Sequence, residues 1–148
     1  MIHYIIGDAT YPIGEGNKII SHIVNDVNRW GAGFVIAVSK RWKEPEAAYR
    51  KMEKRSLGNV QIVPVTDNIS VANMIAQHDI RPDANGCPPI RYGAVRAALA
   101  AVNDIAYRTH ATIHMPRIGC GLAGGSWELI EAIIQVVASV DVYVYDLK

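Results

Sequence analysis

Short apolar runs alternate along this chain with segments whose apolar residues recur at the helical period, and this alternation constrains the fold more than any other feature. Apolar runs of strand length, bounded by Gly, Asn or Asp, are typical of buried β-strands. Apolar side chains that recur every three or four residues are typical of a helix with one buried face. The alternation predicts an α/β layer fold in which helices cover both faces of a mixed, mostly parallel sheet.

Six segments have strand character: residues 2–6, 18–24, 60–65, 69–76, 112–118 and 141–147. Four helices are predicted, beginning at Phe34, at Pro45 (and continuing to about Arg55), at Tyr92, and at Trp127 behind a Ser126 N-cap. Residues 66–68 predict a turn, and the proline-containing segment 77–91 predicts a loop long enough to act as a lid. No repeat or linker divides the chain, so we expect one domain over residues 1–148.

The composition excludes several classes of protein. Of the 148 residues, 50% are apolar, and 15 Lys and Arg balance 14 Asp and Glu, which argues against a disordered chain and against a dedicated nucleic-acid binder. No apolar run approaches the roughly 18 residues that span a bilayer. Two cysteines provide neither a disulfide framework nor a four-cysteine metal site, and His3, His110 and His114 are not expected to hold a metal ion. We therefore expect a cytoplasmic protein with no metal or cofactor and no membrane partner.

Two glycine-containing turns, residues 31–33 and 119–125, each precede a predicted helix. Glycines allow successive backbone N–H groups to point into one concavity, and the start of a helix adds partial positive charge. Two such turns suit the two phosphates of a pyrophosphate, although each could also be a simple tight turn. The second turn matches the glycine pattern of a dinucleotide-binding fold, which needs further βα units after its acidic residue. Only seven residues follow the candidate acid, Asp141, so this fold is not expected. No Gly-Lys-Ser/Thr follows either turn, which also excludes a P-loop.

Polar residues follow the first two predicted strands. Asp8 could accept a hydrogen bond from a purine amine, and Asn25 and Asp26 could bind ribose hydroxyls. Taken alone, each of these residues is more typical of an ordinary turn.

Several segments together resemble a macro domain, over nearly the whole chain and in that family's order: GDAT at 7–10, HIVND at 22–26, GAG at 31–33, MPRIGCGL at 115–122, Trp127, and VYVYDL at 142–147. The MPRIGCGL segment is similar to the branch that contains the terminal ADP-ribose protein glycohydrolases and the yeast-type ADP-ribose-1''-phosphate phosphatases. The resemblance implies a three-layer α/β/α sandwich. Its implied ligand is ADP-ribose or a 1''-substituted derivative, free or attached to an ADP-ribosylated protein.

The resemblance also implies a place for each part of that ligand. Asp8 and Ala9 would lie against the adenine, with Leu147 near the adenosine, and Asn25 would face the distal ribose. The two glycine turns would hold the diphosphate between them. The implied ligand-binding residues are Asp8, Ala9, Asn25, Gly31, Ala32, Gly33, Arg117, Ile118, Gly119, Cys120, Gly121, Leu122, Ala123 and Leu147.

Two departures from the family pattern bear on catalysis. The glycohydrolase branch uses a lysine that attacks the sugar C1'' and an aspartate that acts as acid and base, whereas Gln77 and Ala123 hold those positions here. Glutamine cannot form a Schiff base and alanine cannot transfer a proton, so lysine-dependent glycohydrolysis is not expected. His22 instead resembles the phosphatase relatives, in which a histidine of this strand is linked to activity. We therefore take His22 as the candidate base and Asp26 as a candidate that orients water.

His22 has a second interpretation, because its strand is mostly apolar and a buried, hydrogen-bonded structural histidine fits equally well. Cys120 precedes a helix start that could lower its pKa, but a small residue packed in a phosphate loop explains it better. The expected function is hydrolysis of a 1'' substituent, phosphate or an acyl or protein ester, from an ADP-ribose derivative. A reader that binds ADP-ribose without turnover is the alternative. A nucleic-acid surface at residues 40–55 is disfavoured, because acids interleave with its bases.

Overall fold

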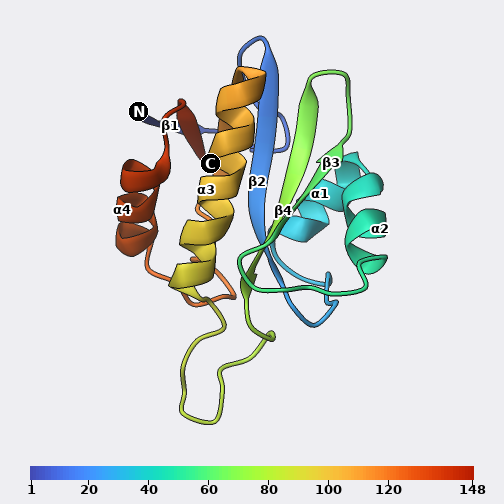
Figure 1. Ribbon diagram of the computed structural model, residues 1–148, viewed down its shortest axis with the longest axis vertical. Coiled ribbons are helices and arrows are strands. Elements are labelled where there is room, and N and C mark those ends of the chain that lie inside the picture. The colour runs from blue at the N-terminus through green and yellow to red at the C-terminus, as the bar shows by residue number, and fades with distance from the viewer.

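The structure, a computed structural model, describes residues 1–148 as one six-stranded sheet with four helices (Figure 1). The strand order is β1-β6-β5-β2-β4-β3, and every neighbouring pair is parallel except β3 and β4. The elements are β1 (Ile2–Ile6), β2 (Asn17–Asn25), α1 (Phe34–Arg41), α2 (Glu44–Arg50), β3 (Val60–Pro64), β4 (Ile69–Gln77), α3 (Tyr92–Thr109), β5 (Ala111–Pro116), α4 (Trp127–Val137) and β6 (Val142–Asp146).

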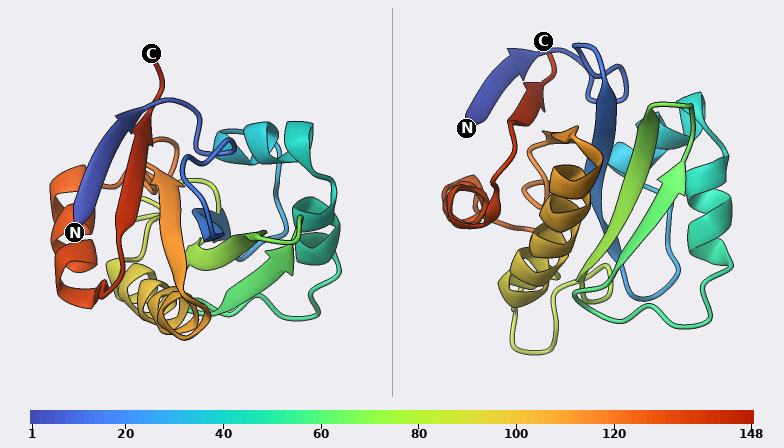
Figure 2. Two further views of the ribbon diagram at one scale, coloured as in Figure 1. Left: turned by 90° about the horizontal axis from the view of Figure 1, so that it is seen from above. Right: turned by 45° about the horizontal axis from the view of Figure 1, so that its top comes forward.

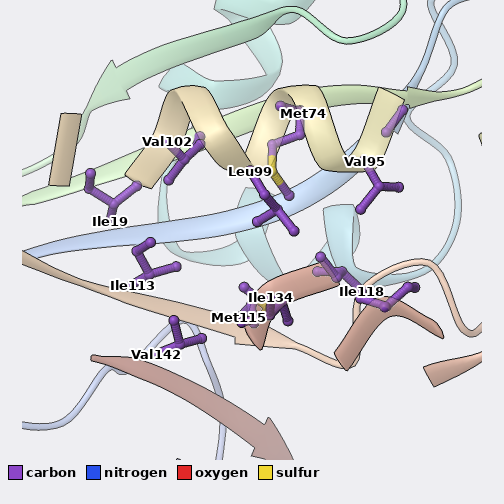
Figure 3. Packing of buried hydrophobic residues seen from close by; sticks show 14 of the residues in the cluster. Ile19, Met74, Val95, Leu99, Val102, Ile113, Met115, Ile118, Ile134 and Val142 are labelled. Atoms are coloured by element: carbon purple, nitrogen blue, oxygen red, sulfur yellow. The ribbon is translucent and has the colours of Figure 1, made fainter. Parts of the chain in front are cut away.

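The helices form a layer on each side of this sheet (Figure 2). α3 and α4 cover one face over the larger apolar core, part of which is shown in Figure 3, and α1 and α2 cover the other face over a smaller core. Ile19 and Ile20 are adjacent in β2 but belong to different cores, as the alternation of side chains along a strand requires. The predicted three-layer α/β/α architecture with a mixed, mostly parallel sheet is confirmed.

The predicted α2 is too long, because the helix ends at Arg50 and not near Arg55. Nη2 of Arg55 donates hydrogen bonds to the carbonyl oxygens of Tyr49 and Arg50, at 3.0 and 3.1 Å. A basic side chain thus takes carbonyls that a continuing helix would have used. β5 likewise ends at Pro116, two residues before its predicted end at Ile118, and the other strand boundaries differ by no more than one residue. Ser126 precedes α4 as predicted, but its side chain makes no capping hydrogen bond.

The chain changes direction across the sheet between β2 and β5. After β2 it continues through α1 and α2 to β3 and β4 on one side of β2, whereas after β5 it continues through α4 to β6 on the opposite side of the sheet. β2 pairs with β5 only from Asn17 to Ile20, while its second half pairs only with β4. Ligands of open α/β sheets bind beyond the carboxyl ends of the strands at such a reversal, so the topology itself places a crevice here.

The segment between β4 and α3, residues 78–91, forms the long loop that protrudes beyond the sheet in Figure 1. Its two ends are fastened, because Gln77 and Ile90 form an isolated antiparallel bridge and the Arg91 N–H donates to the Ala76 carbonyl. None of the helices combines the length and the apolar character that a membrane span requires.

Candidate functional site

Two adjoining cavities open where β2 and β5 part. The first, of about 230 Å³, is lined by His22, Ile23, Ala32, Gly33, Phe34, Val35, Gln77, Pro116, Arg117, Ile118, Gly119, Gly121, Leu122 and Ala123. The second, of about 280 Å³, is lined by Ile23, Val24, Asn25, Arg29, Gly31, Ala32, Val35, Gln77, Ile80 and Leu122. The two cavities share a wall made by five side chains from β2, α1, β4 and both glycine turns, so they form one continuous crevice.

The two predicted glycine turns face one another across the first cavity. A Cβ built on Gly33 would lie 3.8 Å from Cδ1 of Leu122, which is van der Waals distance. The backbone N–H groups of Ala32, Gly33, Gly121, Leu122 and Ala123 donate no hydrogen bond within the chain. Main-chain donors without a partner are rare unless solvent or a ligand takes them. Two sets of them in the wall of one cavity can hold an anion with more than one phosphate group.

The second turn keeps its shape because of tight packing around Gly119. This residue has a φ of 72°, in the left-handed region, and a Cβ built on it would lie only 2.5 Å from Cδ1 of Ile90. The Gly125 N–H donates to the Gly119 carbonyl at 2.6 Å, and the Ile90 N–H donates to the Ala123 carbonyl at 3.1 Å. The turn is therefore closed on itself and attached to the end of the long loop, while the N–H groups of 121–123 stay free.

His22 lies in the wall of the first cavity, on β2, and is only 1% exposed. Its Nε2 lies 2.6 Å from Oδ1 of Asn73, and its Nδ1 has no hydrogen-bond partner. The ring packs edge-on against Trp30 and tilted against Phe34. Burial lowers the pKa of His22 from 6.5 to about 4, although the hydrogen bond with Asn73 opposes the shift. The imidazole is therefore neutral at physiological pH, with one free nitrogen.

Asn25 and Asp26 end β2 but use their polar atoms on the protein itself. Oδ1 of Asn25 accepts hydrogen bonds from the N–H groups of Val27 and Arg29 and from the Tyr49 hydroxyl, so Asn25 shapes the turn that leads to residue 31. Asn25 still lines the second cavity.

Asp26 lines neither cavity. Its Oδ2 lies 2.7 Å from Nδ1 of His78, and its Oδ1 accepts a hydrogen bond from the Asp79 N–H at 2.8 Å. Its predicted role in orienting water stays a prediction.

The residues expected at the adenosine end lie at the carboxyl ends of β1 and β6, outside both cavities. Oδ1 of Asp8 accepts hydrogen bonds from the backbone N–H and the hydroxyl of Thr10, which is the turn geometry that the sequence left open. Ala9 is buried and Leu147 is exposed. The Asp146 N-terminal to Leu147 is paired through both oxygens with Arg117. The adenine contacts of Asp8, Ala9 and Leu147 remain predictions.

The charge that precedes the second turn is already paired. Arg117 lines the first cavity, but its guanidinium pairs with Asp146 and lies over the rings of Tyr4 and Trp127. Burial raises the pKa of the Cys120 thiol, although nearby Arg117 opposes this, and the residue does not line the cavities. A thiolate at Cys120 is therefore disfavoured.

The positions that depart from the family pattern both line the crevice. Gln77, at the place of the glycohydrolase lysine, lines both cavities, and its Nε2 donates to the Asp79 carbonyl at 2.9 Å. Ala123 is buried in the wall of the first cavity. No group of three or more His, Cys, Asp or Glu side chains is arranged to hold a metal ion.

Sequence reasoning missed seven residues that line the crevice: Ile23, Val24, Arg29, Phe34, Val35, Ile80 and Pro116. Arg29 lines the second cavity, Ile80 lines it from the long loop, and Phe34 lies beside His22. Phe34 was assigned to a buried helix stripe by its spacing, and Arg29 follows a turn with no motif around it. The position of Arg29, between the end of β2 and the first glycine turn, is the signal that could have identified it.

Solved structures of other proteins share this fold over almost the full chain. A Bacteroides thetaiotaomicron protein described as being of unknown function is 54% identical, with a TM-score of 0.95 over 99% of this chain and 98% of that one. A macrodomain protein from Streptomyces coelicolor is 44% identical, with a TM-score of 0.85 over 99% of both chains. At the level of the fold alone, Thermosipho africanus DarTG in complex with ADP-ribose has a TM-score of 0.69 at 14% identity, over 88% of this chain and 38% of that one.

Among curated proteins, the mouse (Mus musculus) chromodomain-helicase-DNA-binding protein 1-like is 35% identical over 146 residues. The match covers 90% of this chain but only 16% of that much longer relative. No protein-family model matches the sequence. The identity and the full mutual coverage with the Streptomyces structure are decisive, and the chain belongs to the macrodomain family.

Proposed function

We propose that the chain binds ADP-ribose in the crevice between β2 and β5. The observation that supports this most strongly is the set of free backbone N–H groups at 32–33 and 121–123, which line one cavity from two sides. A diphosphate offers oxygens to both sides at once, which a single phosphate does not. The Thermosipho protein, which has this fold over 38% of its chain, is in complex with ADP-ribose, and this supports the same class of ligand here.

The proposed reaction is hydrolysis of a substituent at the 1'' position of the distal ribose, with phosphate as the preferred substituent. A water oxygen would attack the phosphorus, the P–O bond to the sugar would break, and the sugar oxygen would take a proton. His22 supports this proposal, because a neutral imidazole with a free Nδ1 can accept a hydrogen bond from water. Free N–H groups would stabilise the charge on the ligand phosphates. An ester to an acyl group or to a protein would be cleaved by the same arrangement.

Gln77 and Ala123 favour a second candidate, a reader of free or protein-linked ADP-ribose. Neither side chain can perform the acid, base or nucleophilic steps of lysine-dependent glycohydrolysis. Release of phosphate from ADP-ribose-1''-phosphate distinguishes the two candidates. Phosphate released in proportion to enzyme supports the hydrolase, whereas tight binding without release supports the reader.

Binding is tested first by thermal shift with ADP-ribose, AMP and NAD. ADP-ribose at about 100 times its Kd should stabilise the fold by about 2.7 kcal/mol. AMP should bind far more weakly, because it offers one phosphate to two sets of donors. NAD keeps the diphosphate, so weak binding of NAD would reflect the nicotinamide on its distal ribose. An equal response to ADP-ribose and AMP would contradict the proposed diphosphate site.

A single substitution then tests where the ligand binds. A Cβ on Gly121 would have open space around it, so Gly121→Leu should fold normally but fill the cavity, and ADP-ribose binding should be lost. Gly93→Leu is the matched control, because Gly93 is also uncrowded but lies on α3 outside both cavities. Wild-type affinity in Gly121→Leu would exclude the crevice as the binding site.

A further inference from the structure

A buried polar chain connects His22 to α2 and β3. Oδ1 of Asn73 lies against Nε2 of His22, and Nδ2 of Asn73 donates to the Pro45 carbonyl at 3.2 Å and to Oε1 of Gln61 at 3.1 Å. Nε2 of Gln61 in turn donates to the Ala48 carbonyl at 2.9 Å. Both backbone carbonyls can only accept, so the orientation of both amides is determined and Oδ1 of Asn73 must face the histidine.

This orientation decides which nitrogen of His22 bears hydrogen. An amide oxygen only accepts, so Nε2 of His22 must be the donor in the 2.6 Å contact with Asn73. A neutral imidazole has one N–H, and Nδ1 is therefore an unprotonated acceptor. The pKa of His22, lowered to about 4 by burial, keeps the ring in this neutral form at physiological pH.

The free nitrogen lies on the side of the ring away from β4. Asn73 lies opposite His22 in the β2–β4 pair, so Nε2 faces β4. The two ring nitrogens point in nearly opposite directions, and Nδ1 therefore points toward the side on which β2 is no longer paired with β5. His22 lines the first cavity, but Nδ1 itself is closed to solvent and has no hydrogen-bond partner, so an O–H group reaches it only when the side chains around it move.

We propose that Asn73 is a positioning residue that holds His22 in the Nε2–H tautomer, so that Nδ1 accepts a hydrogen bond from a hydroxyl of the distal ribose or from the attacking water. This inference rests on the proposed ADP-ribose function and deepens it. It specifies the chemistry at this point of the cavity: an O–H donor is accepted, whereas an ionised phosphate oxygen would meet the Nδ1 lone pair and be disfavoured.

The tautomer is measured in the free protein by ¹⁵N NMR of the histidine rings. We expect the Nδ1 resonance of His22 at the position of an unprotonated nitrogen and Nε2 at that of a protonated one. Saturating ADP-ribose should then shift the Nδ1 resonance, because a hydroxyl or an ordered water donates to it. A protonated Nδ1 in the free protein would overturn the inference, as would an Nδ1 resonance that stays unchanged while ADP-ribose binds.

Asn73→Ala removes the acceptor for Nε2 and should give a mixture of tautomers, with ADP-ribose binding weaker by about tenfold, the worth of one hydrogen bond. Asn103→Ala is the matched control, since Asn103 makes two hydrogen bonds with Ser139 far from the crevice and should bind within twofold of wild type. An Asn73→Ala variant that is folded and keeps a single tautomer would contradict the positioning role.

The outcomes separate this inference from the proposed function. ADP-ribose binding with Nδ1 protonated or unaffected refutes the role of Asn73 and leaves the binding function intact. Absence of ADP-ribose binding to the wild-type protein refutes the proposed function, and the ligand contact of Nδ1 with it.

Discussion

Two histidines are buried in neighbouring strands of the same sheet and use their nitrogens differently. His22 in β2 and His114 in β5 are 1% and 0% exposed, and burial lowers the pKa of each to about 4. Nε2 of His114 lies 2.7 Å from the Thr112 hydroxyl, its Nδ1 lies 2.8 Å from the Tyr145 hydroxyl, and its ring stacks on Tyr143. His22 has a partner for Nε2 alone.

The difference shows that neither burial nor a lowered pKa identifies a functional histidine in this protein. Both residues have these properties, and they differ in how many of their ring nitrogens have a hydrogen-bond partner. A buried group with every polar atom satisfied is explained by the fold, as His114 is. His22 lines a cavity and has a buried nitrogen without a donor, so a ligand or water is the donor that remains for it.

In response to pH the two histidines should behave alike, and this is the largest effect that we expect. The pKa of each is about 4 in the folded protein and 6.5 without burial, so the unfolded chain binds more protons between these values. The free energy of unfolding should be highest above about pH 6.5. It should fall as the pH drops to 4, by up to about 3 kcal/mol for each histidine. Urea unfolding at several pH values measures this. A pH-independent midpoint between 4 and 6.5 would be inconsistent with two neutral buried rings.

Turnover should separate the two residues. His22→Leu should lower kcat for ADP-ribose-1''-phosphate by about 100-fold, the usual worth of a group that assists proton transfer. His114→Phe should leave kcat within about twofold, because His114 lies outside both cavities. Phosphate release under saturating substrate is the measurement. An equal loss of kcat in both variants would mean that His22 has no special role in turnover and that both histidines support only the fold.

Thermodynamic stability should show the opposite ranking. His114→Phe removes the hydrogen-bond partner of two buried or half-buried hydroxyls, Thr112 and Tyr145, and should cost about 2 kcal/mol. His22→Leu leaves one amide oxygen of Asn73 without a donor and should cost about 1 kcal/mol. Denaturant unfolding at pH 7 compares the two variants with wild type. A larger cost for His22→Leu would show that His22 is the more important structural residue.

The sequence predicted the layers better than the site because the layers depend on periodicity. Val95, Leu99 and Val102 are buried at the spacing that predicted α3, and every predicted strand is present. Where a side chain decided the outcome, prediction failed: the end of α2 depends on Arg55, which reaches back to two carbonyls. Periodicity contains no information about such a contact. That residues 1–148 form a single domain stays a prediction.

The same limit applies to the candidate site. The glycine turns could be found, since their residue types are unusual and they precede helices. The difference between His22 and His114 could not, because it depends on Asn73 and Tyr145, which are 51 and 31 residues away from the histidines that they contact. Asp26 shows this most clearly: it follows β2 as a site residue would, yet both its oxygens are used by the long loop.

Substitution of His78 should have the smallest effect on ADP-ribose binding, and it tests whether Asp26 acts through the long loop. It is a third kind of histidine, about half exposed and paired with a carboxylate, and the pair fastens the start of the loop that bears Ile80 to the end of β2. Although burial of Asp26 favours a raised pKa, the hydrogen bond from the Asp79 N–H and the contact with His78 hold the pKa below its usual 3.8. The stabilisation that the Asp26 carboxylate gains from these contacts is therefore present above about pH 4 and is lost as the pH falls further.

An exposed pair of this kind is worth about 0–1 kcal/mol, so His78→Ala should weaken ADP-ribose binding by no more than about fivefold. If Asp26 acts through the loop, Asp26→Asn should weaken binding by a similar factor and leave kcat close to wild type. If Asp26 orients the attacking water, Asp26→Asn should lower kcat far more than His78→Ala does. Calorimetric titration with ADP-ribose, together with kcat for both variants, decides between the roles. The two bound oxygens of Asp26 and its absence from the cavity walls lead us to expect the effect on binding.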